Sequence, residues 1–124
     1  MIATLCYLEK NNKYLMLYRN KKENDINKGK WIGVGGKLEK GETPEQCLVR
    51  EVFEETGYKL NNYKYKGLVI FNYNEDEPLF MYVYTSSDFS GIEKKCDEGD
   101  LKWIPKNEIL DLELWEGDKI FLKL

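Results

Sequence analysis

Three glutamates, Glu51, Glu54 and Glu55, stand close together near the middle of the chain. On a helix, residues three and four apart are neighbours, so Glu51 would lie beside both of the others. Like charges at this spacing destabilise a helix by roughly 0.2–0.5 kcal/mol a pair. A hard divalent cation, which takes oxygen ligands, would relieve the repulsion. The spacing therefore indicates a metal site.

A solvated helix face is the alternative interpretation of the same residues. Acidic side chains are common on exposed helix faces, and Arg50 stands four residues before Glu54, the spacing of a weak surface ion pair. The preceding segment, residues 31–42 (WIGVGGKLEKGE), favours the metal site. Its glycines recur where backbone must approach another group closely or turn with positive φ. We therefore interpret this glycine loop and the acidic helix as one functional unit.

The helix that must position the glutamates has clear start and stop signals. Thr43 is suited to the N-cap, Pro44 to the first helical position, and Gln46 to closing a capping box with Thr43. Gly57 supplies the left-handed residue that ends many helices. The sequence therefore predicts a helix over residues 44–56.

The two faces of this helix are expected to differ. At about 100° per residue, the three glutamates share one arc. The opposite arc is expected to face the core and holds five residues: Leu48, Val49, Val52, Phe53 and Thr56.

The rest of the chain alternates mainly between segments typical of strands. We expect a hairpin from residues 2–8 and 13–19, a second pair from 63–72 and 79–85, a short strand at 101–104 and a final helix at 116–124. No internal repeat or low-complexity linker interrupts them. The 124 residues can bury one core, so we expect one α+β domain, residues 1–124, with a mixed sheet.

Composition limits the partners and the compartment. A net charge of -3 and a pI near 5.2 disfavour long nucleic acid, which is bound largely through phosphate neutralisation. The sequence has neither a long apolar run nor the pattern of a signal peptide, so we expect no membrane association and a cytoplasmic protein. The odd number of cysteines, without a Cys-x-x-Cys pair, predicts reduced thiols rather than disulfides or a zinc site.

The glycine segment and the helix together resemble the Nudix box. The match is carried by Gly36, Glu42, Arg50-Glu51, Glu54-Glu55 and Gly57, at the spacing of that signature. Tyr58 departs from the family, which usually has an aliphatic residue there. The resemblance implies an α/β/α sandwich with the mixed sheet between helices.

The resemblance also implies a set of site residues. The implied metal ligands are the carbonyl of Gly35 and the carboxylates of Glu51, Glu54, Glu55 and Glu98, the last from a loop before Trp103. The implied cofactor is Mg²⁺, with Mn²⁺ as the alternative. Arg50 is expected to orient the glutamates, and Glu51, Glu54 and Glu98 are the other catalytic candidates. Because the chain has no histidine, a carboxylate or metal-activated water must act as base.

Similarity beyond the box points to the MutT-type branch, which hydrolyses 8-oxo-dGTP. It is carried by residues 27–37 and 114–118. This branch implies that Trp115 stacks on a purine and that Asp118 binds its edge. Lys37 and Arg19 are further substrate-binding candidates. Ile32 stands where some relatives have asparagine, so the base preference of the branch does not carry over whole.

Three functions follow as hypotheses. The leading one is Mg²⁺-dependent hydrolysis of oxidised purine nucleoside triphosphates to monophosphate and pyrophosphate. The second is hydrolysis of another nucleoside diphosphate derivative, such as a nucleotide sugar or a 5′-triphosphorylated RNA end. The third is a non-catalytic module that senses a nucleotide. The sequence leaves a monomer and a dimer equally open.

Overall fold

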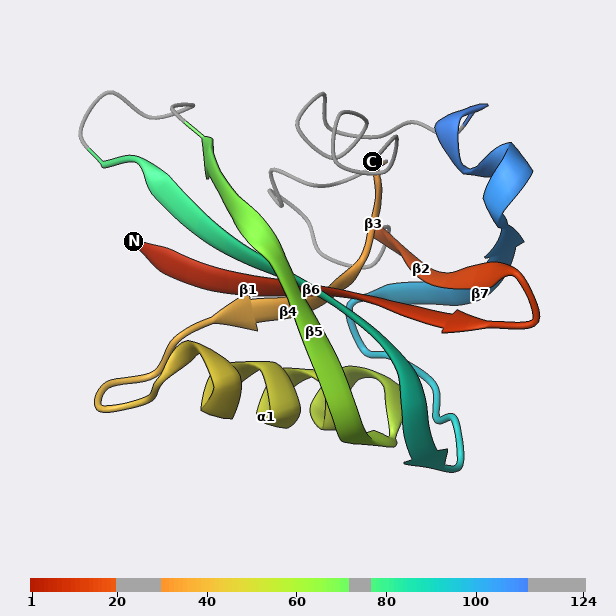
Figure 1. Ribbon diagram of the computed structural model, residues 1–124, viewed down its shortest axis with the longest axis horizontal. Helices are drawn as coiled ribbons and strands as arrows, with labels where there is room; N and C mark the ends of the chain where they lie inside the picture. Colours follow the sequence, from red (N-terminus) through yellow and green to blue (C-terminus); the bar gives the residue numbers. More distant parts are fainter. Residues whose placement is uncertain (20–29, 72–76, 112–124) are drawn as a thin grey trace.

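The protein forms a mixed β-sheet with one α-helix against it (Figure 1). The computed structural model describes residues 1–19, 30–71 and 77–111. The strands are β1 (Ile2–Lys10), β2 (Lys13–Arg19), β3 (Trp31–Ile32), β4 (Val34–Lys37), β5 (Tyr58–Phe71), β6 (Leu79–Gly91) and β7 (Gly99–Pro105). The helices are α1 (Pro44–Thr56) and a 3₁₀-helix, η1 (Lys106–Asp111). The predicted mixed sheet is confirmed, and the predicted helix at 116–124 lies outside the described residues.

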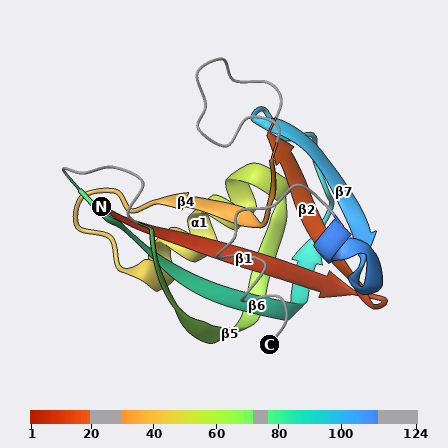
Figure 2. The same ribbon diagram turned by 90° about the horizontal axis from the view of Figure 1, so that it is seen from above.

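Strand β1 is the centre of the sheet and pairs with three neighbours. Residues 2–8 pair in parallel with residues 80–86 of β6, and residues 3–6 pair antiparallel with β4. The predicted hairpin to β2 turns at Asn11 and Asn12, which both have the left-handed φ that a tight hairpin turn requires. Only two residue pairs join β1 to β2 before the strands diverge (Figure 2).

The glycine segment occupies the space between the diverging strands. Strand β3 pairs with β2, and β4 pairs with β1, so the segment crosses from one strand to the other at Gly33. The prediction of a loop over residues 31–42 was therefore wrong for residues 31–32 and 34–37. The glycines are needed for close packing: a Cβ atom on Gly35 would lie 2.0 Å from the carbonyl oxygen of Thr4 in β1.

Helix α1 has the predicted bounds and caps. The Thr43 hydroxyl accepts a hydrogen bond from the Gln46 amide (3.1 Å), and the Thr43 amide donates to the Gln46 side chain (2.9 Å). Gly57 closes the helix with φ of 85° and donates to the Phe53 carbonyl (2.9 Å).

The predicted faces of α1 were partly wrong. Phe53 is 54% exposed, whereas Glu55 is only 6% exposed. The buried arc runs through Leu48 and Val52 to Glu55, which places Phe53 on the solvent side. Glu55 can be buried because its carboxylate accepts a hydrogen bond from the backbone amide of Gly35.

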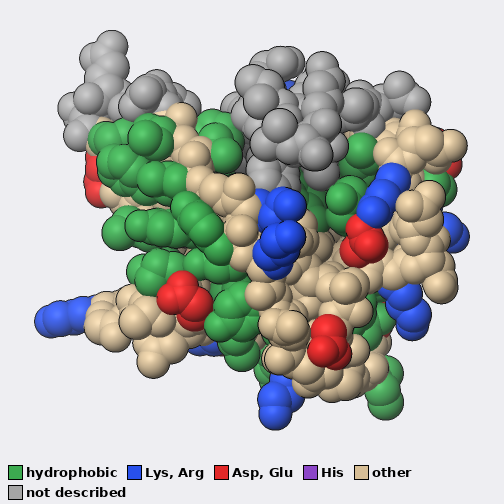
Figure 3. All heavy atoms as spheres, viewed as in Figure 1, with side chains coloured by type: hydrophobic (Ala, Val, Ile, Leu, Met, Phe, Trp, Pro, Cys, Tyr) green, Lys and Arg blue, Asp and Glu red, His purple; other side chains and the backbone are tan. Residues whose placement is uncertain are grey.

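Two clusters of buried side chains lie on opposite faces of β1, since successive residues of a strand alternate. Cys6 and Leu8 face α1 and pack with Leu48 and Val52, whereas Leu5 belongs to the cluster on the other face. Hydrophobic side chains also gather on the left of the surface, over β5 and β6 (Figure 3). The exposed large apolar residues of these two strands are Tyr65, Leu68 and Ile70.

Strands β5 to β7 are longer than expected. The predicted pairing of β5 with β6 is confirmed, and β7 pairs antiparallel with β2. Strands β5 and β6 are antiparallel, with register shifts that let them bend over α1.

The three cysteines are free and buried, which confirms the predicted thiols. In the described part of the chain, no helix is both long and apolar enough to cross a bilayer.

Candidate active site

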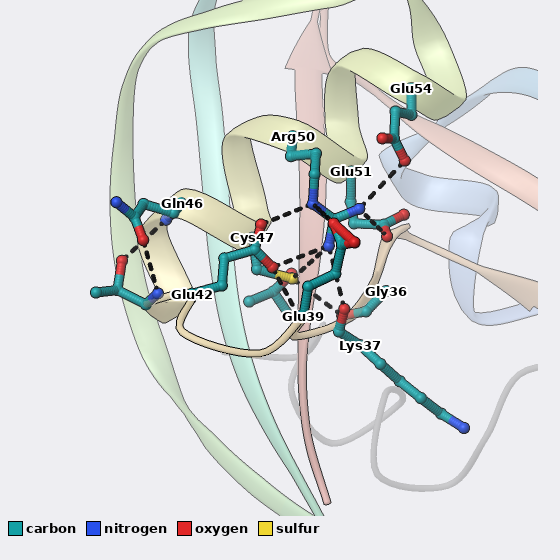
Figure 4. A network of polar contacts seen from close by, with 11 residues as sticks. Gly36, Lys37, Glu39, Glu42, Gln46, Cys47, Arg50, Glu51 and Glu54 are labelled. Carbon is teal, nitrogen blue, oxygen red and sulfur yellow. Dashed lines mark hydrogen bonds and ion pairs between the residues drawn. The ribbon is translucent and has the colours of Figure 1, made fainter.

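Arg50 is the centre of a network of carboxylates at the surface of α1 (Figure 4). Its Nε and Nη2 atoms donate to the two oxygens of Glu42, at 2.7 and 2.9 Å. Its Nη1 atom donates to Glu51 (2.7 Å) and to Glu54 (3.2 Å). Glu39 adds an ion pair to Nε at 2.9 Å. A single guanidinium therefore contacts two of the three helix glutamates and two acids of the preceding turn.

The same arginine fixes the strand that faces the helix. Its Nη2 atom donates to the carbonyl oxygen of Lys37 at the end of β4 (3.2 Å). Hydrogen bonds from Arg50 hold the pKa of Glu42 at about 2, well below its usual 4.5, and the carboxylates raise the pKa of Arg50. Arg50 thus joins β4, residues 38–43 and α1, and it contacts glutamates that it was expected to orient.

Glu51 lies against the glycine strand. A Cβ atom on Gly36 would come within 2.5 Å of the Glu51 carboxyl carbon, so the missing side chain leaves the space that this carboxylate fills. The Glu51 side chain is only 17% exposed, and burial raises its pKa although Arg50 opposes the shift. The carboxylate is therefore partly desolvated beside a backbone strand.

Glu55 is the most buried acid of the helix. The amide of Gly35 donates to its Oε2 atom at 3.1 Å. Burial, followed by the hydrogen bond and charge of Glu98, raises the pKa of Glu55 to about 9. Glu98 in turn pairs with Arg19, at 3.6 Å. The structure thus brings the loop glutamate predicted from the resemblance into contact with the helix.

The remaining predicted site residues are those expected to bind substrate. The side chain of Lys37 is exposed and points away from the carboxylates (Figure 4). Arg19 lies beside Glu98 at the end of β2. Trp115 and Asp118, the predicted base contacts, lie outside the described residues.

Sequence reasoning missed the parts played by Glu39 and Cys47. The Cys47 thiol is within hydrogen-bonding distance of the Gly36 carbonyl and the Thr4 hydroxyl, each at 3.4 Å. The only sequence signal for Cys47 was its position one helical turn before Glu51. Glu39 has no periodic signal, because it lies in an irregular segment before the helix.

The chemistry of the donor set fits a hard cation. Within residues 1–19, 30–71 and 77–111, no three Asp, Glu, Cys or His side chains converge closely enough to hold an ion by themselves. Mg²⁺ is commonly bound by only one or two carboxylates, together with water and substrate phosphates. The raised pKa of Glu55 beside Glu98 also marks a pair of carboxyl groups that a nearby cation would stabilise in the charged form.

The fold is a small α+β domain with a carboxylate-rich site, built from an acidic helix, a glycine strand packed against it and a glutamate from a distant loop. The chain belongs to the Nudix family, whose NUDIX domain matches residues 1–124.

Two curated relatives cover most of the chain. An uncharacterized Nudix hydrolase, YvcI from Bacillus subtilis, is 29% identical over 94% of this chain and 73% of its own length. An oxidized purine nucleoside triphosphate hydrolase from Danio rerio is 29% identical over 83% of this chain and 67% of its own length.

A solved structure supports the fold at full length. A MutT mutator protein from Bacillus halodurans superposes with a TM-score of 0.83 and 30% identity, covering 99% of this chain and 80% of that one. The predicted α/β/α Nudix sandwich, and the resemblance to MutT proteins, are thereby confirmed.

Proposed function

We propose that this Nudix protein hydrolyses oxidised purine nucleoside triphosphates, such as 8-oxo-dGTP, to the monophosphate and pyrophosphate in the presence of Mg²⁺. The observation that carries the proposal is the set of helix carboxylates packed against β4. The Gly35 amide donates to Glu55, and Glu51 fills the space beside Gly36. Arg50 binds both Glu51 and Glu54. This arrangement places carboxylates along the glycine strand. The name of the Danio rerio relative supports the choice of substrate.

The proposed metal ligands are the Gly35 carbonyl and the carboxylates of Glu51, Glu54, Glu55 and Glu98. When bound, Mg²⁺ supplies neutralisation of phosphate charge and activation of water. Manganese would serve the same donors, since it also accepts oxygen ligands.

The protein's own residues have distinct proposed tasks. Arg50 keeps Glu51 and Glu54 in fixed rotamers, which reduces the entropy lost when substrate binds. Glu51, Glu54 and Glu98 are the proposed catalytic carboxylates, one of which would accept the proton of the attacking water, because the chain has no histidine.

The proposed substrate contacts lie around the carboxylates of the site. Lys37 is exposed at the end of β4, and its long side chain would turn towards the carboxylates to bind a phosphate as a point charge. Arg19 is close enough to Glu98 to bind a phosphate at the same place. Trp115 and Asp118 remain the proposed contacts to the purine base.

The decisive experiment is a product assay with a substrate panel. The purified protein is incubated with Mg²⁺ and with 8-oxo-dGTP, dGTP, nucleotide sugars or triphosphorylated RNA, and products are separated by chromatography. We expect pyrophosphate and the monophosphate from 8-oxo-dGTP, much faster than from dGTP. Equal rates would contradict a preference for oxidised purine nucleotides. Turnover of the nucleotide sugars or triphosphorylated RNA alone would establish the second hypothesis, and binding without turnover would establish a sensor.

A further inference from the structure

The loop that delivers Glu98 is attached to the rest of the protein by a second acidic residue, Glu93. The Oε1 atom of Glu93 accepts hydrogen bonds from the Tyr58 hydroxyl (3.2 Å) and from the Trp103 indole (3.0 Å). Tyr58 begins β5 directly after the helix cap, and Trp103 lies in β7. One carboxylate therefore links the end of α1 to the strand that follows the loop.

Aromatic packing makes these two donors a rigid pair. The rings of Tyr58 and Trp103 both contact Phe89, at centroid distances of 4.9 and 6.2 Å. Aromatic contacts of this kind fix the orientation of the rings, so the Tyr58 hydroxyl oxygen and the Trp103 indole N–H are held in place for their hydrogen bonds to Glu93. The aliphatic residue usual at position 58 in the family would not supply a hydroxyl.

Backbone contacts hold the loop close to the helix end at the same place. The Lys94 amide donates to the Thr56 carbonyl at 2.8 Å. A Cβ atom on Gly57 would lie 2.4 Å from the Ile92 carbonyl oxygen, so the loop passes directly over the cap glycine. Cys96 is buried in the core further along the loop.

We propose that Glu93 is a positioning residue: its bonds to Tyr58 and Trp103 hold residues 92–98 so that Glu98 meets Glu55 on the helix. The inference rests on the proposed function only for the role of Glu98 at the metal. The loop has no regular secondary structure of its own before β7, so these attachments set where Glu98 lies. Glu93 acts through Glu98 and has no contact with substrate in this scheme.

The test compares Glu93→Ala, which removes the acceptor, with Glu93→Gln, whose amide oxygen keeps it. Hydrogen exchange of residues 92–98 is measured by mass spectrometry, and Mg²⁺ affinity by calorimetry. We expect Glu93→Ala to speed exchange in the loop and to weaken Mg²⁺ binding about tenfold, the lower end of what loss of an outer-shell contact costs. Glu93→Gln should remain close to the wild type.

Two further variants distinguish the role of the Glu93 hydrogen bonds from the effect of changing any charge in the loop. Tyr58→Phe removes one hydrogen bond and keeps the ring, so it should give a smaller change in the same direction. Asp97→Asn changes a charge in the same exposed loop and should leave both measurements unchanged. Unchanged hydrogen exchange of the loop in Glu93→Ala would overturn the positioning role of Glu93. Faster exchange with unchanged Mg²⁺ affinity would overturn it too, as would a Glu93→Gln variant as impaired as Glu93→Ala. A wild-type protein that neither binds Mg²⁺ nor hydrolyses any nucleotide would instead overturn the proposed function and the role of Glu98.

Discussion

Arg50 binds Glu42 with two parallel hydrogen bonds, one to each carboxylate oxygen, at 2.7 and 2.9 Å. This is the fork geometry in which arginine is most selective for a carboxylate. Because Glu42 lies before the helix and Arg50 inside it, the pair fixes the turn that leads from β4 into α1.

The pair predicts a specific loss of stability in acid. The pKa of Glu42 is lowered from 4.5 to about 2, so the unfolded chain binds this proton more readily than the folded protein. Its contribution is therefore complete above about pH 4.5 and is lost as the pH falls towards 2. The free energy of unfolding of wild type minus that of Glu42→Gln, from urea denaturation, should shrink over this range. A difference that does not change with pH would contradict the assignment.

Three glycine variants should distinguish a loss of stability from a loss of hydrolytic activity. In Gly36→Ala the new methyl meets the Glu51 carboxylate, which can move, so hydrolysis should fall while stability stays close to the wild type. In Gly35→Ala it meets the Thr4 carbonyl in β1, so pairing of β1 with β4 should fail and the protein should unfold more readily.

Gly41→Ala is the matched control, because its position has open space but φ of 82°. It should cost about 1 kcal/mol through backbone strain and leave kcat unchanged. Thermal unfolding and kcat of the three proteins provide the comparison. Equal losses of activity in Gly36→Ala and Gly41→Ala would argue against a role for the contact with Glu51.

Glu54→Gln should abolish most activity without unfolding the protein. The Glu54 side chain is 57% exposed, so its replacement should change the free energy of unfolding by less than about 0.5 kcal/mol. A neutral amide is a weaker ligand for a hard cation, so kcat should fall about a hundredfold or more. Glu45→Gln, on the same helix, keeps an acceptor for the Tyr84 hydroxyl and serves as the control. Near-normal kcat for Glu54→Gln would remove this residue from the proposed metal site.

Magnesium itself should stabilise the folded protein. A ligand at about 100 times its dissociation constant adds roughly 2.7 kcal/mol when it binds only the folded state. We expect MgCl₂ to raise Tm, EDTA to reverse the rise, and NaCl at equal ionic strength to give a smaller effect. The rise should be much reduced in Glu51→Gln. Equal shifts in this variant and the wild type would place the ion elsewhere.

Local signals explain which parts of the fold were predictable. The bounds of α1 depend on Thr43, Pro44, Gln46 and Gly57, all within the helix or its caps, so neighbouring residues were enough to identify them. The turn at Asn11 and Asn12 is equally local.

The features that were predicted wrongly depend on contacts between segments distant in the sequence. Burial of Glu55 requires the Gly35 amide from another element, and no helical periodicity contains that information. The glycines of β4 fit a loop and a tightly packed strand equally well until β1 is placed beside them. The meeting of Glu98 with Glu55 was expected from family resemblance alone, since no local pattern links a loop to a helix so far away in the chain.

The parallel pairing of β1 with β6 has a consequence for how the protein is made. Residues 2–8 cannot complete the sheet until residues 80–86 are available. Contacts so distant in sequence slow folding, because a long loop must close before they form. During synthesis the first strand must therefore wait with its edge unpaired, and helix α1 emerges before the surface on which it finally packs is complete.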